Sequence, residues 1–284
     1  MNPEEEKEFF SNLEFSYSRT KEDVWASLDQ KLDRKDTETT KPQARVIPMK
    51  RIWLSVAAAV ALILTSGLFA RFYTTSVSVS AGEFTSHTLP DGSEVHLNAE
   101  TTLSYNPYWW RFERKVAMEG EAYFVVAKGE RFSVISNQGS TEVLGTEFNV
   151  YARGEVYEVY CKTGKVKVSN ASASASEQIT PGESARVSKS AVLKLRKAGQ
   201  EEEVLSWRSG RFVYNNTPLT KVFEDLERHY AIEINLASKS IGKITHTFTP
   251  ERSSGAEAIL QSLGLAKNLN IEQQEPGVFL ISKQ

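Results

Sequence analysis

Residues 52–70 read IWLSVAAAVALILTSGLFA, a run of 19 residues without a charged side chain between Arg51 and Arg71. As a helix rising about 1.5 Å per residue, the run would be roughly 28 Å long, close to the roughly 30 Å hydrocarbon core of a bilayer. A buried core helix is the competing interpretation. A cleaved secretory signal is rejected, because such signals have a short basic leader and about 50 residues of mixed charge come first here. We therefore predict a transmembrane helix over residues 52–70.

The two flanks of this run differ in charge. Residues 41–51 contain basic residues and no acidic residue, whereas the chain after Arg71 has no Lys or Arg before Arg111. Positive residues in short loops stay on the cytoplasmic side. The sequence therefore predicts a single-pass protein of the inner (cytoplasmic) membrane, with its N-terminus in the cytoplasm and its C-terminus in the periplasm.

Residues 1–38 carry two amphipathic helical patterns, and residues 39–51 form a basic juxtamembrane linker. Thr20 with Asp23 resembles a capping box ahead of the second pattern. Two helices this short cannot shield their apolar faces alone. Either they cover each other weakly, or they bury these faces on another protein, and both readings stay open. The apolar residues are Phe9, Phe10 and Leu13 in the first pattern, and Val24, Trp25, Leu28 and Leu32 in the second.

Residues 72–204 are predicted to form an all-β domain. Short segments that alternate apolar and polar residues are separated by turn dipeptides such as Asp91-Gly92, Thr163-Gly164 and Pro181-Gly182. No helical period of useful length appears between the turns. A sandwich, a barrel and a solenoid-like stack all fit this pattern.

The period changes in residues 207–284, which predict a small α+β domain of order βαββαββ with two helices on one sheet. Thr217 is expected to cap the first helix, with Pro218 at its first position. The second helical face is expected to end at Gly264.

Composition excludes several classes of protein. The formal net charge of −2 argues against direct nucleic-acid binding, and one cysteine excludes a disulfide framework. No zinc, phosphate-loop or dinucleotide motif occurs, so we expect no enzyme activity, catalytic residue, cofactor or metal. Cys161 is expected to be buried and inert, and His229 to be solvated. A tethered hydrolase using a carboxylate such as Glu121 is the enzymatic alternative.

Several ordered motifs resemble the FecR family of membrane-bound anti-sigma factors. They are LPDGSEVHLN at 89–98, EGEAYF at 119–124, VLGTEFNV at 143–150 and TPGE at 180–183. The C-terminal unit is similar to the small domain of that family, which is related to short N-terminal domains of secretins and TonB-dependent transducers. The motif residues, expected to be structural, are Leu89, Pro90, Asp91, Gly92, Gly120, Glu121, Ala122, Tyr123, Phe124, Leu144, Gly145, Thr146, Phe148, Pro181 and Gly182.

This resemblance implies a signalling function. The cytoplasmic segment would hold an extracytoplasmic-function sigma factor through the seven apolar residues of its two patterns. The periplasmic part would meet the signalling domain of a TonB-dependent outer-membrane transducer, for which the strand Val278, Phe279, Leu280 and Ile281 is the expected docking edge.

Site-1-type and intramembrane proteases would then free the sigma factor, and membrane lipid would surround the anchor. The cytoplasmic part is short for the family and lacks a distinctive sigma-binding motif. A membrane-tethered periplasmic scaffold without a sigma partner therefore stays as the alternative.

Overall fold

The computed structural model describes Lys7, Ser11 and residues 18–36, 49–196 and 199–284. The first apolar pattern, with Phe9, Phe10 and Leu13, lies outside the described residues.

Helix α2 (Lys21–Asp36) carries the second pattern. The backbone N of Thr20 donates to Asp23 Oδ2 over 3.1 Å, and the backbone N of Asp23 donates to Thr20 Oγ1 over 3.3 Å. These reciprocal bonds satisfy free amides at the helix start and confirm the capping box.

Helix α3 (Met49–Phe72) contains the apolar run. Its stretch Ile52–Phe72 has 21 residues and a mean hydropathy of 2.2, and none of its most apolar window is buried. This exposure argues against a soluble core helix and is compatible with a single membrane span.

The β domain is a sandwich of two layers that share one long strand, β5 (Arg114–Val125). The first half of β5 pairs with β4 and β6, and its second half pairs with β3 and β8. Besides β5, layer one holds β1 (Thr75–Val79), β4 (Thr101–Tyr105), β6 (Phe132–Ile135), β7 (Gly139–Val143), β10 (Val166–Asn170) and β11 (Ser176–Ile179). Layer two holds β2 (Thr85–Thr88), β3 (Glu94–Leu97), β8 (Glu147–Arg153), β9 (Val156–Cys161), β12 (Ser184–Val187) and β13 (Val192–Leu195).

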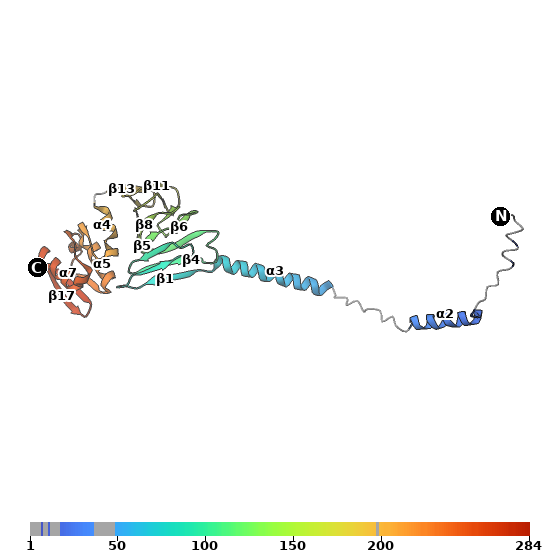
Figure 1. The fold of residues 1–284 in the computed structure, drawn as a ribbon. Helices are drawn as coiled ribbons and strands as arrows, with labels where there is room; N and C mark the ends of the chain where they lie inside the picture. The colour runs from blue at the N-terminus through green and yellow to red at the C-terminus, as the bar shows by residue number, and fades with distance from the viewer. Residues whose placement is uncertain (1–6, 8–10, 12–17, 37–48, 197–198) are drawn as a thin grey trace. The chain divides into compact units, whose positions relative to one another are not determined.

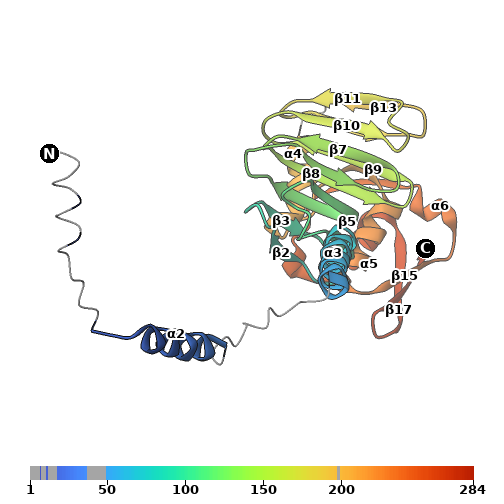
Figure 2. The same ribbon diagram turned by 90° about the vertical axis from the view of Figure 1, so that its right-hand side faces the viewer.

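After β5 the chain adds antiparallel hairpins alternately to the two layers (Figure 2). Hairpin β6–β7 extends layer one, β8–β9 extends layer two, and β10–β11 and β12–β13 repeat the alternation. Of the three architectures that the sequence leaves open, the structure is the sandwich, built by a stack of hairpins.

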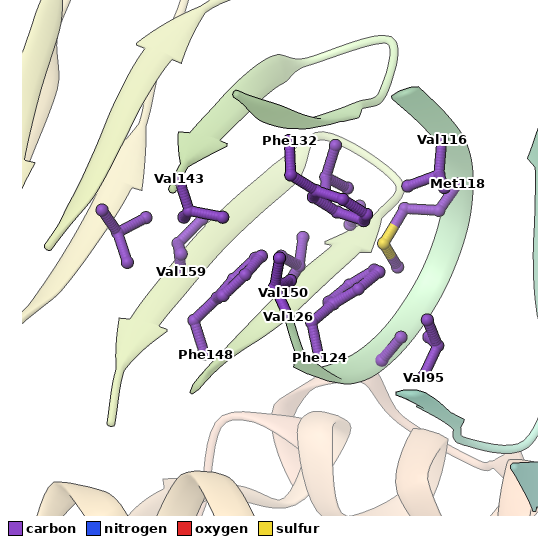
Figure 3. Packing of buried hydrophobic residues seen from close by; sticks show 14 of the residues in the cluster. Val95, Val116, Met118, Phe124, Val126, Phe132, Val143, Phe148, Val150 and Val159 are labelled. Carbon is purple, nitrogen blue, oxygen red and sulfur yellow. The ribbon is translucent and has the colours of Figure 1, made fainter. Parts of the chain in front are cut away.

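The core of the sandwich lies between the layers and contains aromatic and β-branched side chains (Figure 3). Phe124 and Phe148 stack with ring centroids 5.1 Å apart, and Phe132 meets Phe124 edge-on at 6.1 Å. All three are fully buried. Because Phe132 belongs to layer one and the other two to layer two, these contacts join the layers.

Two elements that the sequence did not predict, helix α4 (Gln200–Leu205) and 3₁₀ turn η1 (Ser206–Ser209), lead into the C-terminal domain. That domain contains β14 (Tyr214–Pro218), α5 (Leu219–Tyr230), β15 (Glu233–Leu236), α6 (Lys239–Gly242), β16 (Thr245–Phe248), η2 (Arg252–Ser254), α7 (Ala256–Lys267), β17 (Leu269–Glu275) and β18 (Val278–Lys283). The predicted order βαββαββ is confirmed, with α6 as an extra turn of helix. The apolar faces of α5 and α7 pack into one core with the strands.

Three details of this domain differ from prediction. Its strands form two sheets, β14–β16 and β15–β18–β17, instead of one. Alternation predicts which face of a strand is buried but not its neighbour, so pairing could not be deduced. Thr217 and Pro218 end strand β14, and Pro218 precedes the helix without a side-chain cap. Helix α7 continues through Gly264 to Lys267, where Asn268 takes the left-handed conformation that ends it.

Candidate functional site

The apolar stripe of α2 is solvent-exposed. Val24 and Leu28 each expose 44% of their surface, and Trp25 and Leu32 each expose 59%. On a helix these positions share one side. An exposed apolar stripe of this size is typical of a surface that binds a partner.

The LPDG motif builds a turn that is fastened to the sandwich. Asp91 accepts hydrogen bonds from the backbone N and the hydroxyl of Ser93, at 3.0 and 2.8 Å. Arg114 Nε donates to Asp91 Oδ2 over 2.7 Å and the two side chains form an ion pair. Although burial raises the pKa of Asp91, the hydrogen bonds and the Arg114 charge outweigh it, and the pKa is lowered. Leu89 is buried and Gly92 has φ +81°, so both residues help to shape this turn.

The EGEAYF motif lies where β5 passes from one layer to the other. Gly120 has φ +116°, and a Cβ there would lie 2.5 Å from Thr101 Oγ1. Ala122 and Phe124 point into the core, and the Tyr123 hydroxyl donates to Glu147 Oε2 over 2.7 Å. Glycine is therefore required at this corner, since any side chain would meet strand β4.

The remaining motifs also serve turns. At Gly145, a Cβ would approach Lys128 Cα to 2.7 Å, and Phe148 is buried in the core. Leu144 is 65% exposed, so it contributes nothing to the core. Gly182 has φ +82° in the turn after Pro181. Next to it, Lys194 and the Thr180 backbone donate hydrogen bonds to Glu183 and lower its pKa to about 2.

The single cysteine, Cys161, is fully buried, and burial raises its thiol pKa to about 11, in agreement with an inert role.

A cleft of about 680 Å³ lies between the sandwich and helix α5 (Leu219–Tyr230), and charged side chains from both sides line it. From the sandwich side, Glu121 accepts amide hydrogen bonds from Asn98 and Asn149, each 2.9 Å long. Burial is the main cause of a raised pKa for Glu121, and the charge of Lys221 and the two amides only partly oppose it. Glu121 is half-buried and lines the cleft, because the second domain covers this part of β5.

From the α5 side, Lys221 crosses the cleft. Its Nζ lies 4.6 Å from the ring centroid of Tyr151 and 2.6 Å from Asp225 Oδ1. Arg228 donates to the same oxygen of Asp225 over 3.1 Å. Burial would raise the pKa of Asp225, but the two cations and their hydrogen bonds lower it. Sequence reasoning missed this network, because a Lys and an Asp four residues apart on a helix usually indicate a solvated pair.

His229 lies beside this network and is half-buried, so the prediction of a solvated histidine is wrong. Its ring meets Phe212 edge-on with centroids 4.9 Å apart. Burial is the main cause that lowers its pKa to about 4, although Asp225 opposes the shift. The charges that act on it come from Asp225 and Arg228 of its own helix, from Arg153 of β8 and from Arg252 of η2, so both domains surround the ring.

Three further contacts join the two domains. The backbone N of Gly82, in the turn after β1, donates to Arg228 O over 2.7 Å. Arg252 lies 4.3 Å above the Phe84 ring, and Arg208 lies 3.8 Å above the Tyr123 ring. The cleft is thus bounded by direct contacts between the sandwich and the C-terminal domain.

The strand Val278–Ile281 is not an edge, so that prediction is wrong. It belongs to β18, which pairs in parallel with β15 and antiparallel with β17. Phe279 and Ile281 are buried. The final strand of a chain can insert between two earlier strands, and its position in the sequence gives no sign of it. Among the described strands of this sheet, β15 and β17 form the edges.

The described residues thus comprise an exposed apolar stripe, one apolar helix, a sandwich whose motifs serve its turns, and a second domain held by a charged interface. The family model "FecR protein" matches residues 75–167, and the model "FecR, C-terminal" matches residues 211–280. Comparison with curated protein sequences gave no match.

Two crystal structures, each described as a candidate anti-sigma factor from Parabacteroides distasonis ATCC 8503, share this fold at 32% sequence identity. The first, at 1.65 Å resolution, matches 74% of this chain and 99% of its own with a TM-score of 0.66. The second, at 2.50 Å, matches 75% of this chain and 100% of its own with a TM-score of 0.67. The chain belongs to the FecR family of anti-sigma factors.

Proposed function

We propose that this protein is a transmembrane anti-sigma factor that holds an extracytoplasmic-function sigma factor at the cytoplasmic face of the inner membrane. In this proposal α3 spans the bilayer, and the sandwich and the C-terminal domain are periplasmic. The observation that carries it is α3 itself, a wholly exposed apolar helix of 21 membrane-compatible residues between α2 and the two FecR regions. The basic residues 41–51 before it support a cytoplasmic N-terminus.

The exposed stripe of α2 is the proposed sigma-binding surface. Burial of Trp25 and its neighbours against the sigma factor would keep that factor from RNA polymerase. A buried Trp is a typical hot spot, worth about 2 kcal/mol or more. The transducer's signalling domain is proposed to bind at an edge of the β15–β18–β17 sheet in the C-terminal domain. Strand β17 replaces β18 as the candidate, because one side of β17 has no partner among the described strands. Proteolysis in the periplasm and then in the membrane would release the sigma factor.

The direct test is affinity capture of sigma factors by the full-length membrane protein from the source cells. Trp25→Ala is expected to lower sigma-factor capture at least tenfold, while Gln30→Ala, an exposed position outside the apolar stripe of the same helix, leaves capture unchanged. Equal capture by the wild type and Trp25→Ala would contradict the assigned surface. Absence of any sigma factor from all three samples would favour a periplasmic scaffold.

The transducer contact needs a separate test. A photo-crosslinking residue replacing Glu272, exposed in β17, is expected to capture the transducer in cells, whereas one replacing Glu257, exposed on α7, is not. Capture from both positions or from neither would contradict docking at the β17 edge.

A further inference from the structure

The loop between β4 and β5 brings aromatic side chains to the end of α3. Asn106 Nδ2 donates to the carbonyl oxygens of Ala70 and Arg71, over 2.9 and 2.8 Å. These carbonyls belong to the last turn of α3, where no helical amide can reach them. The Asn106 Oδ1 accepts the backbone N–H groups of Tyr108 and Trp109, over 3.0 and 2.9 Å. One side chain thus both caps α3 and folds the loop that follows it.

The folded loop continues the aromatic surface of the helix. The Tyr108 ring lies 5.2 Å from Tyr73 and 6.3 Å from Phe69, measured between centroids. The Trp109 ring packs against the Phe112 ring, with centroids 4.6 Å apart. Arg71 lies 5.2 Å above the Trp109 ring.

These aromatic side chains are not part of the sandwich core. Phe69 exposes 62% of its surface, Phe72 72%, Tyr108 60% and Phe112 70%, whereas the adjacent Trp110 is buried. An aromatic patch that is left in water next to an apolar helix is a docking surface. Aromatic rings, and Tyr and Trp in particular, concentrate at the headgroup level of bilayers, where one part of the ring is apolar and the other is wet.

We infer that residues 106–112 form a membrane wedge, which inserts Tyr108, Trp109 and Phe112 into the headgroup region beside α3 and seats the sandwich on the bilayer. The occupant is lipid, because the patch is continuous with Phe69 on the helix that is proposed to span the bilayer and with Tyr73 directly after that helix. Arg71 and the exposed Arg111 add positive charge that favours anionic headgroups. The inference rests on the proposed membrane span, but it adds a second, independent contact with the membrane.

The test uses the full-length protein in vesicles of phosphatidylethanolamine and phosphatidylglycerol, with spin labels on single introduced cysteines. Wild-type protein provides the background, since Cys161 is fully buried. The variants are Phe112→Cys in the wedge, Leu62→Cys in α3 and Phe84→Cys as the matched control. Phe84 is an aromatic residue of similar exposure, 58%, in the loop between β1 and β2, where its ring faces Arg252 of the C-terminal domain instead of α3.

The readout is the ratio of collision rates with oxygen and with a water-soluble nickel complex, which rises with depth in the bilayer. We expect a high ratio at position 62, an intermediate ratio at position 112, severalfold above that at position 84, and a low ratio at position 84. Equal ratios at positions 112 and 84 with a high ratio at position 62 would overturn the wedge and leave the span intact. A low ratio at position 62 would overturn the span and the wedge together.

Discussion

Gly120 and Thr101 are in such close contact that the sandwich has no room for a side chain at position 120. Thr101 Oγ1 accepts the Glu121 backbone N–H over 3.0 Å and donates to the Glu121 carbonyl over 3.1 Å. Strand β4 therefore holds β5 at the residue where β5 leaves one layer for the other. This contact explains why the EGEAYF motif has a glycine at position 120.

Replacement of Gly120 by Ala should destabilise the protein by about 3 kcal/mol, because the new methyl group would overlap strand β4 and the positive φ would be strained. Gly92→Ala separates the two causes. Gly92 also has a positive φ, +81°, but no atom lies within 4 Å of its added Cβ. Its expected cost is about 1 kcal/mol. Urea unfolding of both variants measures the difference, and equal losses would show that the Thr101 contact is unimportant.

The LPDG turn should depend on the charge of Asp91. Asp91→Asn would leave the Arg114 guanidinium, whose side chain is only 12% exposed, without its counter-charge. We expect a loss of about 2 kcal/mol of unfolding free energy. The matched control is Glu113→Gln, which breaks the ion pair with Lys115 at an exposed site, where about 0.5 kcal/mol or less is at stake. Similar losses in the two variants would show that the ion pair between Asp91 and Arg114 is not what stabilises the turn.

Acid should weaken the C-terminal domain through His229. Its pKa is near 4 when folded and near its ordinary value of 6.5 when unfolded, so the unfolded state binds the proton first as the pH falls. The contribution is present above about pH 6.5 and is lost towards pH 4, with an amplitude of about 3 kcal/mol. Thermal unfolding across this range checks it. His229→Gln should flatten the dependence, and an unchanged slope in that variant would assign the effect to another group.

The interface between the domains should open when Asp225 loses its charge. Asp225→Asn leaves Lys221 and Arg228 facing each other across a partly buried site, with the Arg228 side chain only 16% exposed. We expect faster hydrogen exchange of the Gly82 amide, which bonds to Arg228 O, by about tenfold or more. Glu224→Gln is the control, since its contact with Arg228 is longer, 3.4 Å, and more exposed. Exchange at Gly82 that is insensitive to Asp225→Asn would contradict a role for this network in holding the domains together.

Local sequence patterns were sufficient to predict the secondary-structure elements, but not which elements lie next to one another. The capping box of α2, the apolar run of α3 and the turns around Gly92 and Gly182 are all readable, because each depends on residues that are close in sequence. The alternating strands of the sandwich were likewise recognisable.

The central position of β18, the burial of His229 and the link between Lys221 and Tyr151 depend on residues far apart in the chain. Periodicity carries no information about such contacts. The resemblance to a known family identified the domains, but it could not place these contacts either.

The connection from α3 to β1 has a mechanical consequence. Helix α3 ends at Phe72 and β1 begins at Thr75, which pairs with Tyr105 of β4 (Figure 1). Among the described strands, β1 pairs with β4 alone. A pull between the proposed membrane anchor and the sandwich would load first the Asn106 hydrogen bonds to Ala70 and Arg71, and then the β1–β4 ladder of five residue pairs. Because these contacts are few, we expect them to break before the sandwich unfolds. They would release an extended segment next to the proposed membrane span, the form of backbone that a protease can bind. Single-molecule pulling between α3 and residue 284 would show this as an early, small extension before the sandwich unfolds.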